Sequence, residues 1–442
     1  MKTLFVLGAI FTSLIAMSCS NQESLDGMLT ESQSLSAPHR YGIPCNSNVI
    51  TKDDAAFVAD KFMEHPTSRG VQHETTYLYN SDGDKIGYII NYDKGYCIVS
   101  SSKDLPPILA YSDEGRFDIN NIALTGLSVW SDNLSYSLNK LTEEERASNK
   151  KQWDIYESNA TQSKAMNNQE KTAALNKRLN EIHEEFGMSV DPRPLFAFKG
   201  SGFISDSYYE MFKNKGGSEE YTIVAWYKKD LGTKVKPMVT TQWNQSGALG
   251  KYADNKLAGC TVVAAGQLMN YFQYPQSYDW NAIASNNYNN EAIALLSKDI
   301  QNKFKVKYGT NGTSSTISNV KEGLEDFGYS VKESEELYSF RLIEKYHQPL
   351  YEQGINEAGI GHAWVVDGYE TFDYQYYYIV EYLRGSAGNY YYERDNTTYS
   401  ADDGNLVVPT LTHYNWGWGG AEDGFYQEPK YKKNVKQLNL SK

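Results

Sequence analysis

Most motifs that mark a metal or cofactor protein are missing from this chain of 442 residues. It has only four cysteines, at positions 19, 45, 97 and 260, and no CxxC or HExxH pattern. The seven histidines show no metal-ligand spacing, and neither a Walker sequence nor a dinucleotide-binding glycine pattern occurs. A serine-hydrolase elbow and internal repeats are absent as well. We therefore expect neither a metal site nor a cofactor.

Clusters of positive charge are also scarce. The formal net charge is −13, and no long run of lysine and arginine occurs. An acidic protein of this kind is poorly suited to bind the phosphates of nucleic acid or an anionic membrane surface, so neither is expected as the main partner. The length, by contrast, allows two or three domains with substantial cores.

No confident transmembrane helix is predicted at the N-terminus, because the apolar stretch LFVLGAIFTSLIAM is too short for one. It follows a short positive start and ends just before Cys19, which predicts an export signal over residues 1–18. Cys19 matches the lipidated cysteine of a bacterial lipobox, although Ala16 is a weaker match than leucine. The alternative is ordinary signal cleavage beside a chance cysteine. Residues 19–44 are typical of a flexible tether.

The remaining cysteines offer little scope for disulfides. Export permits them, but only Cys45 and Cys97 are available to pair. Cys97 lies in an apolar, strand-like run, so we expect a buried free thiol there rather than a bridge. Cys260 is left unpaired and needs either a packing or a reactive explanation.

The segment 45–125 has the pattern of a small α+β domain. Thr51 precedes an amphipathic helix with acidic residues in its first turn. Residues 75–102 then indicate three short strands separated by Asp-Gly and Lys-Gly turns.

Residues 126–230 are polar and are expected to connect two domains. Thr142 and Glu145 form a capping box, and apolar residues are thinly spread, which predicts one or two long solvated helices. Residues 231–442 form the last domain. Its helical patterns begin at residue 260 and precede its strand patterns, so an α+β domain is expected rather than a βαβ repeat.

Cys260 stands at the start of a predicted helix that ends before Pro275. A thiol in this position faces unpaired backbone N–H groups and the positive end of the helix dipole, which lower its pKa from about 8.5 and favour a thiolate nucleophile. Taken alone, a small buried cysteine is the simpler interpretation. A nucleophile would need an imidazole partner that is itself held by an acceptor.

His362 and Asn415 are candidates for those two roles. His362 heads the strand-like run HAWVVDGYE, and Asn415 lies in NWGWGGAEDGFY, where its side-chain carbonyl can accept the imidazole N–H beside a shielding indole. Glycines allow the backbone to turn tightly beneath the aromatic rings. The alternatives are a structural histidine and an aromatic-glycine hairpin that simply closes the core.

Taken together, these segments resemble the streptopain family of bacterial cysteine peptidases. The likeness includes WNQ before the cysteine, GC followed by a small-residue helix ending in YP, and the later PLYEQG, GHAWVVDGY and NWGWGGAEDGFY. The earlier GYCIVSSSKDLPPILAYSDEGRFD resembles the inhibitory pro-domain of that family. The resemblance covers about residues 45–120 and 231–427. It implies an α+β architecture in which a papain-like cysteine peptidase catalytic domain follows a small α+β pro-domain.

The resemblance also implies roles for single residues. Cys260 would be the nucleophile, His362 the general base and acid, and Asn415 the group that orients His362. Gln245 would donate to the oxyanion together with the Cys260 backbone N–H, with a purely structural glutamine as the alternative. The residues expected to shield the His–Asn contact or otherwise support the site are Trp416, Trp418 and Gly361.

Two features depart from the family pattern. A Tyr-rich stretch over about 372–410 replaces a short hairpin, and its turn-like segments favour an extended hairpin that leaves both flanking strands in place. The tail after Phe425 is short and basic and lacks the long glycine-rich loop of the family, so substrate preference is not transferred.

The sequence thus predicts an exported zymogen, a cysteine endopeptidase that hydrolyses proteins or peptides through a Cys–His thioester mechanism. Its own pro-domain would be an intramolecular inhibitor, released by cleavage between about residues 120 and 235. A lipid anchor at Cys19 would hold it at the outer membrane or cell surface if the lipobox is used. Two alternatives stay open: a surface binding lipoprotein on an inactive peptidase scaffold, and a transferase that passes the thioester acyl group to an amine.

Overall fold

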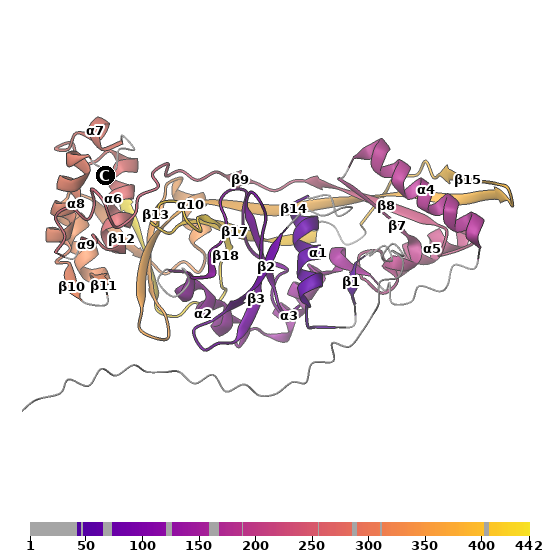
Figure 1. Ribbon diagram of the computed structural model, residues 1–442, viewed down its shortest axis with the longest axis horizontal. Coiled ribbons are helices and arrows are strands. Elements are labelled where there is room, and N and C mark those ends of the chain that lie inside the picture. The colour runs from indigo at the N-terminus through magenta and orange to yellow at the C-terminus, as the bar shows by residue number, and fades with distance from the viewer. Residues whose placement is uncertain are drawn as a thin grey trace, which may run out of the picture. The chain divides into compact units, whose positions relative to one another are not determined.

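The long strand β14 (Gly361–Ser386) is the element around which this computed structural model is organised (Figure 1). It lies in a 15-stranded sheet and pairs with β8, β9, β13, β15, β16 and β17. Cys19, the predicted export signal and most of the tether lie outside the described residues. The structure describes residues 42–45, 47–64, 73–120, 126–158, 168–187, 189–254, 256–284, 290–309, 312–401 and 406–442.

The N-terminal α+β domain folds as the sequence predicts. Helix α1 (Lys52–Phe62) begins with a capping box, in which Oγ1 of Thr51 accepts from the N–H of Asp54 and the Asp54 carboxylate accepts from the N–H of Thr51. Gly83 and Gly95 make the turns, each with a φ of 85° that favours glycine. The antiparallel strands are β2 (Glu74–Tyr79), β3 (Lys85–Asn91), β4 (Tyr96–Ser100) and β5 (Ile108–Ser112).

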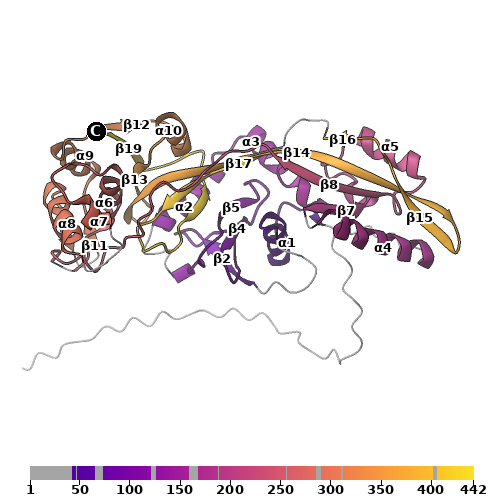
Figure 2. The ribbon, with the colours of Figure 1, turned by 90° about the horizontal axis from the view of Figure 1, so that it is seen from above.

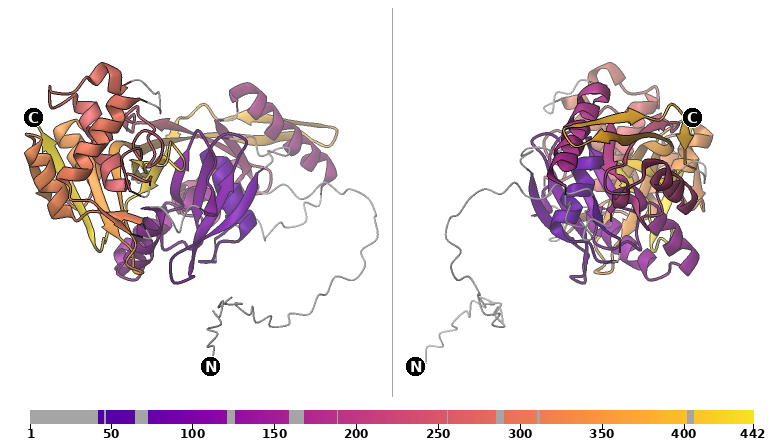
Figure 3. Two further views of the ribbon diagram at one scale, coloured as in Figure 1. Left: turned by 60° about the vertical axis from the view of Figure 1, so that its left-hand side comes forward. Right: turned by 90° about the vertical axis from the view of Figure 1, so that its right-hand side faces the viewer.

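The C-terminal domain packs α6 (Cys260–Phe272) against the start of β14, and α8 (Glu291–Lys303) packs against α6 (Figure 2). Aliphatic and aromatic side chains fill this core, and most of those from α6 are small or aliphatic. The strand order is β12-β19-β13-β14-β17-β18, and β18 then pairs with β5 (Figure 3). The other elements are α7 (Trp280–Ala284), α9 (Ile317–Asp326), α10 (Ser339–Tyr346), β10 (Lys307–Gly309), β11 (Gly312–Ser314), β12 (Ser330–Ser334), β13 (Leu350–Ile355), β17 (Leu406–Asn415), β18 (Gly424–Gln427) and β19 (Val435–Ser441).

Residues 168–230, expected to belong to a polar connector, fold against the Tyr-rich part of β14. We call residues 168–230 together with residues 372–400 the distal lobe (Figure 2). Its strands β7 and β8 extend the sheet from one edge of β14. The elements of the lobe are α4 (Gln169–Phe186), β7 (Val190–Pro194), α5 (Asp206–Gly216), β8 (Ile223–Asp230), β15 (Asn389–Arg394) and β16 (Tyr399–Ser400).

Short elements link the lobe to the two domains. Helix α3 begins with the predicted capping box of Thr142 and Glu145, which is confirmed. The linking elements are β1 (Ile43–Pro44), α3 (Glu143–Lys151), β6 (Glu157–Ser158) and β9 (Lys234–Val235), and α2 (Gly126–Leu138) ends the N-terminal domain.

The predicted extended hairpin is confirmed. Strands β14 and β17 stay paired on both sides of it, from Val365 opposite Asn415 to Tyr374 opposite Leu406. The register shifts twice on the way, once between residues 366 and 368 and again between residues 370 and 372. The two strand-like runs 362–370 and 374–383 are parts of one strand rather than separate strands.

Cys97 is fully buried and unbridged, as predicted. Among the described helices, none combines the length and the apolar character that crossing a bilayer requires. Within the same residues, no three His, Cys, Asp or Glu side chains gather as metal ligands would.

Candidate active site

Cys260 is the first residue of α6, so the predicted helix start is confirmed. The residue before it, Gly259, has a φ of 96°, in the left-handed region that favours glycine. A Cβ at Gly259 would also lie 2.8 Å from Cγ2 of Thr313. Glycine at this position leaves the first turn without a side-chain cap, and the Cys260 thiol stands at the positive end of the helix.

The thiol is surrounded by backbone donors, yet it is protonated in this arrangement. Burial raises the pKa of Cys260 above its usual value, and the N–H groups of Ala363, Thr261 and Cys260 itself oppose that effect without overcoming it. The donor from Ala363 places the sulfur beside β14, one residue after His362. A protonated thiol is a poor nucleophile, so the geometry is that of a resting site.

The imidazole of His362 is buried and bonded to a backbone carbonyl. Its Nε2 lies 2.9 Å from the carbonyl oxygen of Trp416, and because a carbonyl only accepts, Nε2 carries the proton. The ring stacks against the indoles of Trp364 and Trp418, at centroid distances of 6.2 and 5.8 Å and interplanar angles of 10°. Burial lowers the pKa of His362 to about 4, so the imidazole is neutral at neutral pH.

The side chain of Asn415 has partners other than His362. Its Oδ1 accepts from Nε2 of Gln267 at 3.0 Å and from the N–H of Gly417 at 3.1 Å. Its Nδ2 donates to the carbonyl of Thr241 at 3.0 Å. Both lone-pair directions of Oδ1 are therefore filled.

The three residues predicted to carry the chemistry come from neighbouring elements. His362 pairs with Gly354 of β13, and Val365, three residues later on β14, pairs with Asn415 of β17. Cys260 lies across from the same stretch of β14. Among the described contacts, however, no hydrogen bond joins Cys260 to His362 or His362 to Asn415.

Gln267 is a buried site residue that the sequence prediction missed. It lies seven residues after Cys260 on α6, which is two turns and therefore the same side of the helix. Besides bonding Asn415, Gln267 accepts at Oε1 from the Thr241 hydroxyl at 3.1 Å and the Trp243 N–H at 3.3 Å. One side chain thus links the cysteine helix, the loop at residues 241–243 and the end of β17. In the sequence, the one sign of this role is a polar glutamine inside the otherwise small and apolar run VVAAGQLM.

Two of the predicted supporting tryptophans lie around His362. Trp416 is fully buried, and its backbone is held from both sides: the N–H donates to Oδ1 of Asp423 at 2.8 Å, and the carbonyl accepts from His362. Burial raises the pKa of Asp423, which the sequence prediction also missed, to about 7. Trp418 is half-buried and stacks on His362, and Gly361 is exposed at the first position of β14.

Gln245 lies in the loop that precedes α6. Its carbonyl accepts the N–H of Ala258 at 2.8 Å, which ties the loop to the residue two positions before Cys260. The side chain is half-buried. Its donation to an oxyanion stays a prediction.

Helix α2 lies against the site from the N-terminal side. Gly126, its first residue, sits so close that an added Cβ would lie 2.7 Å from Cδ2 of His362 and 2.4 Å from a ring carbon of Trp416. Further along α2, Ser128 accepts from Nδ2 of Asn356 at 3.1 Å. The missing side chain at position 126 lets the helix contact both rings directly.

Comparison with known proteins defines the class. Residues 47–138 match the family model described as Spi protease inhibitor, and residues 276–426 match the peptidase C10 family. The second match includes His362 and Asn415 but begins after Cys260. Streptopain from Streptococcus pyogenes, including serotype M1, is 23% identical over 391 residues, covering 77% of this chain and 73% of streptopain. A solved structure of a mutant fragment of Prevotella intermedia prointerpain A is 16% identical, with 83% of this chain and 98% of that chain covered and a TM-score of 0.41.

The chain is therefore a cysteine peptidase zymogen with an inhibitory pro-domain, in a mixed α+β fold. More particularly, its residues 276–426 match the peptidase C10 family, and it is a distant relative of streptopain. The enzyme class, the pro-domain and the family resemblance expected from the sequence are confirmed. The inhibitor match also includes α2, the helix that contacts His362.

Proposed function

We propose that Cys260, His362 and Asn415 carry out peptide-bond hydrolysis as an endopeptidase, with Gln245 completing the oxyanion site. The observation that carries the proposal is the position of the thiol, at the uncapped start of α6 and one residue from His362 across the Ala363 contact. The other two described cysteines have no such surroundings. One is fully buried inside β4, and burial beside Glu157 raises the pKa of Cys45 to about 12.

The described arrangement fits the latent state of such an enzyme. His362 is neutral, donates to the Trp416 carbonyl and has Gly126 of the pro-domain against its ring. When α2 withdraws, the imidazole gains room to turn, so that one nitrogen faces the Cys260 thiol and the other donates to Asn415. Oδ1 of Asn415 would then exchange one of its two present donors for the imidazole. In the latent state the pro-domain would therefore inhibit in two ways. It covers His362, and it holds the imidazole in an orientation that does not serve the Cys260 thiol.

The assembled site would act in two half-reactions. His362 takes the thiol proton, and the Cys260 thiolate attacks the carbonyl carbon of the scissile bond. The C–N bond breaks as the imidazolium gives its proton to the leaving amine, which leaves a thioester on the sulfur. Water, deprotonated by His362, then attacks the thioester, and the sulfur leaves as the thiolate while the carboxylic product is released.

The negative charge of each tetrahedral intermediate needs donors. The Cys260 backbone N–H at the start of α6 is one, and the side-chain amide of Gln245 is the second that we propose. Donors of this kind contribute about 2.7–4 kcal/mol each to transition-state stabilisation in acyl transfer. The bond from Ala258 to the Gln245 carbonyl supports this role, because it holds the loop near the helix start.

The proposal includes export of the protein. Residues 1–18 would be the signal, and Cys19 would carry the lipid that anchors the chain at the outer membrane or cell surface. The support is the sequence pattern of the first 19 residues. We expect the natural protein to partition into the detergent phase and a Cys19→Ser variant into the aqueous phase; aqueous partitioning of both would exclude the lipid anchor.

The decisive test measures the thiolate itself. The full chain is alkylated with iodoacetamide over a range of pH, before and after maturation, and labelling of each cysteine is measured by peptide mass spectrometry. We expect Cys260 to react only above about pH 8.5 in the latent chain and well below that pH in the matured protein. Cys97 is fully buried in the latent chain and should not be labelled there, so it serves as the internal control for a folded protein.

A matured, folded protein in which Cys260 still reacts only near pH 8.5 would overturn the proposal in favour of a binding scaffold. Product analysis in the presence of an added amine distinguishes a hydrolase from a transferase. Hydrolysis yields only the carboxylate, whereas acyl transfer yields the amide.

A further inference from the structure

We infer that residues 168–230 are a lasting part of the active peptidase, held by the Tyr-rich hairpin of the catalytic domain, and are not discarded with the pro-domain. The inference rests on the proposed maturation by removal of the pro-domain. It restricts the activating cleavage to positions before Gln169. The interface between these two segments of the chain supports it in three ways.

The first support is the backbone pairing. Residues 223–230 of β8 pair antiparallel with residues 374–381 of β14, and β7 covers the far side of β8. Loss of residues 168–230 would remove both strands at once. This part of β14 would then present a row of unpaired N–H and C=O groups at an exposed edge, which favours aggregation.

The second support is that both faces of β14 are buried by the segment. On one face, Leu175 and Ile182 of α4 pack with Ile379 and Leu383. On the other face, reached by the even-numbered residues, Tyr378 packs among aromatic side chains of residues 203–226. The Tyr378 hydroxyl also donates to the carbonyl of Phe203 at 2.6 Å. A hairpin with so much apolar surface on two faces is not suited to solvent.

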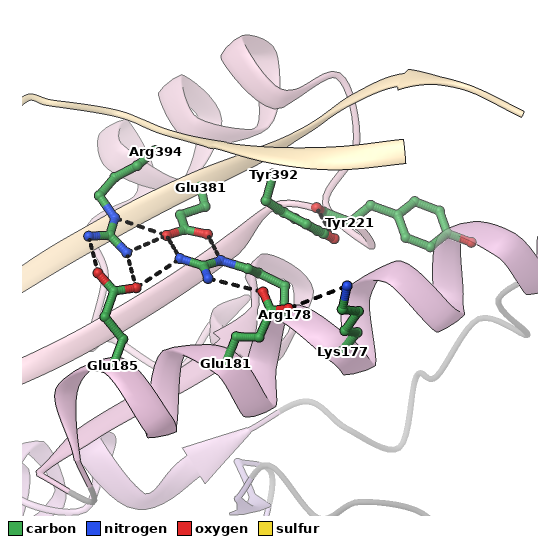
Figure 4. A network of polar contacts seen from close by, with 8 residues as sticks. All are labelled: Lys177, Arg178, Glu181, Glu185, Tyr221, Glu381, Tyr392 and Arg394. Atoms are coloured by element: carbon green, nitrogen blue, oxygen red, sulfur yellow. Dashed lines mark hydrogen bonds and ion pairs between the residues drawn. The ribbon is translucent and has the colours of Figure 1, made fainter. Parts of the chain in front are cut away.

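The third support is a network of ion pairs between α4 and the hairpin (Figure 4). Glu381 of β14 is only 1% exposed, and it accepts from two guanidinium groups. Nε of Arg178 lies 2.7 Å from Oε2 of Glu381, and Nη2 of Arg394 lies 2.8 Å from Oε1. Glu185 of α4 joins both arginines, at 3.1 Å to Arg178 and 2.9 Å to Arg394. Removal of α4 would leave Glu381 with one of its two partners.

The pro-domain is joined to the catalytic sheet by fewer backbone pairs, although the two share a buried core. Strand β5 contacts β18 through two ladder pairs, Tyr111 with Phe425 and Ala110 with Tyr426. The lobe, by contrast, has eight ladder pairs with β14 and the buried ion pairs. After a cleavage between the two segments we expect the pro-domain, which within the described residues contacts the lobe through side chains alone, to leave, and the backbone pairs with β14 to hold the lobe.

The experiment determines the composition of the matured protein. The full chain is allowed to mature, the matured species is isolated by size-exclusion chromatography, and its polypeptides are identified by mass spectrometry after denaturation. We expect residues 168–230 in a one-to-one ratio with residues 260–442, whether joined or bound, and loss of residues 74–118. A matured species that lacks residues 168–230 overturns the inference.

This readout is independent of the proposed chemistry. If the chain proves inactive, it is matured with an added protease, and the same composition is measured. Failure of the peptidase proposal appears as absent turnover, whereas failure of this inference appears as a missing segment.

A matched pair of variants tests the interface directly. Arg178→Ala removes the central guanidinium, and Lys177→Ala removes the neighbouring positive charge, whose side chain is 78% exposed. In limited proteolysis of the matured protein we expect residues 168–230 to be degraded at least tenfold faster with Arg178→Ala and at the wild-type rate with Lys177→Ala. Equal rates in all three proteins would contradict the assigned role of the network.

Discussion

The two ends of β14 are built in different ways. At the Gly361 end, small and aliphatic side chains of α6 pack against the strand, and the polar side chains of Gln267 and Asn415 bond each other at fixed distances. At the Ser386 end, tyrosines and buried ion pairs hold α4 and β8 to the strand. The first end holds the few atoms to which we assign the chemistry, and the second supplies attachment area.

The difference teaches that one strand can serve two independent purposes. A reactive site needs side chains held within fractions of an ångström, which small residues and complete hydrogen bonding provide. Attachment of a lobe needs buried area and paired backbone groups, and it tolerates varied side chains. If this division is real, a change at one end should leave the other end unaffected.

Cys260→Ala should have the largest effect, at the site end. We expect turnover of a peptide substrate to fall by at least about 10⁴-fold, because the nucleophile is lost, while the thermal midpoint stays within a few degrees. Wild type and variant are matured with the same added protease, since the variant cannot mature itself. The control is Cys97→Ala, which removes a buried thiol from the pro-domain and should leave turnover of the matured protein unchanged.

Glu381→Ala should have the largest effect at the lobe end. It leaves two partly exposed guanidinium groups without their shared buried carboxylate, while both keep Glu185 as a partner, so we expect a cost of about 1.5–3 kcal/mol of lobe stability. Hydrogen exchange of residues 168–230 should rise, and turnover should stay within about twofold of wild type. The matched control is Glu393→Ala on β15, which breaks only the exposed pair with Arg384 and should cost about 1 kcal/mol or less. A parallel loss of turnover in Glu381→Ala would show that the ends are coupled.

Acid should weaken the latent form through His362. Its pKa is lowered to about 4 in the folded chain and is near 6.5 when unfolded, so the unfolded chain binds the proton more readily. The stabilising contribution is complete above pH 6.5 and is lost as the pH falls toward 4, by up to about 3 kcal/mol. Asp423, whose pKa is raised to about 7, acts in the opposite direction.

The contribution of His362 is isolated by comparison with His362→Gln. The free energy of unfolding of the wild type minus that of the variant is measured between pH 7 and pH 4. We expect this difference to decline with acid. A difference that stays constant over the range would mean that the ring is not held neutral in the latent form.

Gln267→Met should have a smaller effect, again at the site end. It keeps the volume of the side chain and removes its bonds to Asn415 and to residues 241–243. We expect kcat to fall by about 10–100-fold with little change in KM, because the group that orients His362 loses its support. The control is Gln301→Met, another buried glutamine, whose Nε2 bonds Ser297 on α8. Both variants should lose about 1–3 kcal/mol of stability, and only the first should lose kcat.

The site end was predictable from the sequence because its signals are local. The start of α6 follows from a glycine before the cysteine and a small, apolar run after it, and the strand at His362 follows from a run of buried residues. What the sequence does not contain is the orientation of the imidazole. That depends on Gly126, a residue of another domain that packs against the ring.

The lobe end was not predicted, because its partners lie far apart in the chain. Arg178 and Glu381 are separated by 203 positions, so no local pattern connects them. The three apolar residues that α4 buries are thinly spread among charges, which is typical of a solvated helix. The position of β8 in the fold is set by its pairing with β14, which the sequence of β8 alone does not indicate.

The two register shifts between β14 and β17 lie between the two ends of the strand. A strand alternates its faces with a period of two, so an uncorrected slip by one residue would turn His362 away from Cys260. An irregularity absorbs such a slip locally. A change in the number of residues beyond Phe372 would therefore leave the alternation of faces at His362 unchanged, so the length of the hairpin is decoupled from the orientation of the histidine.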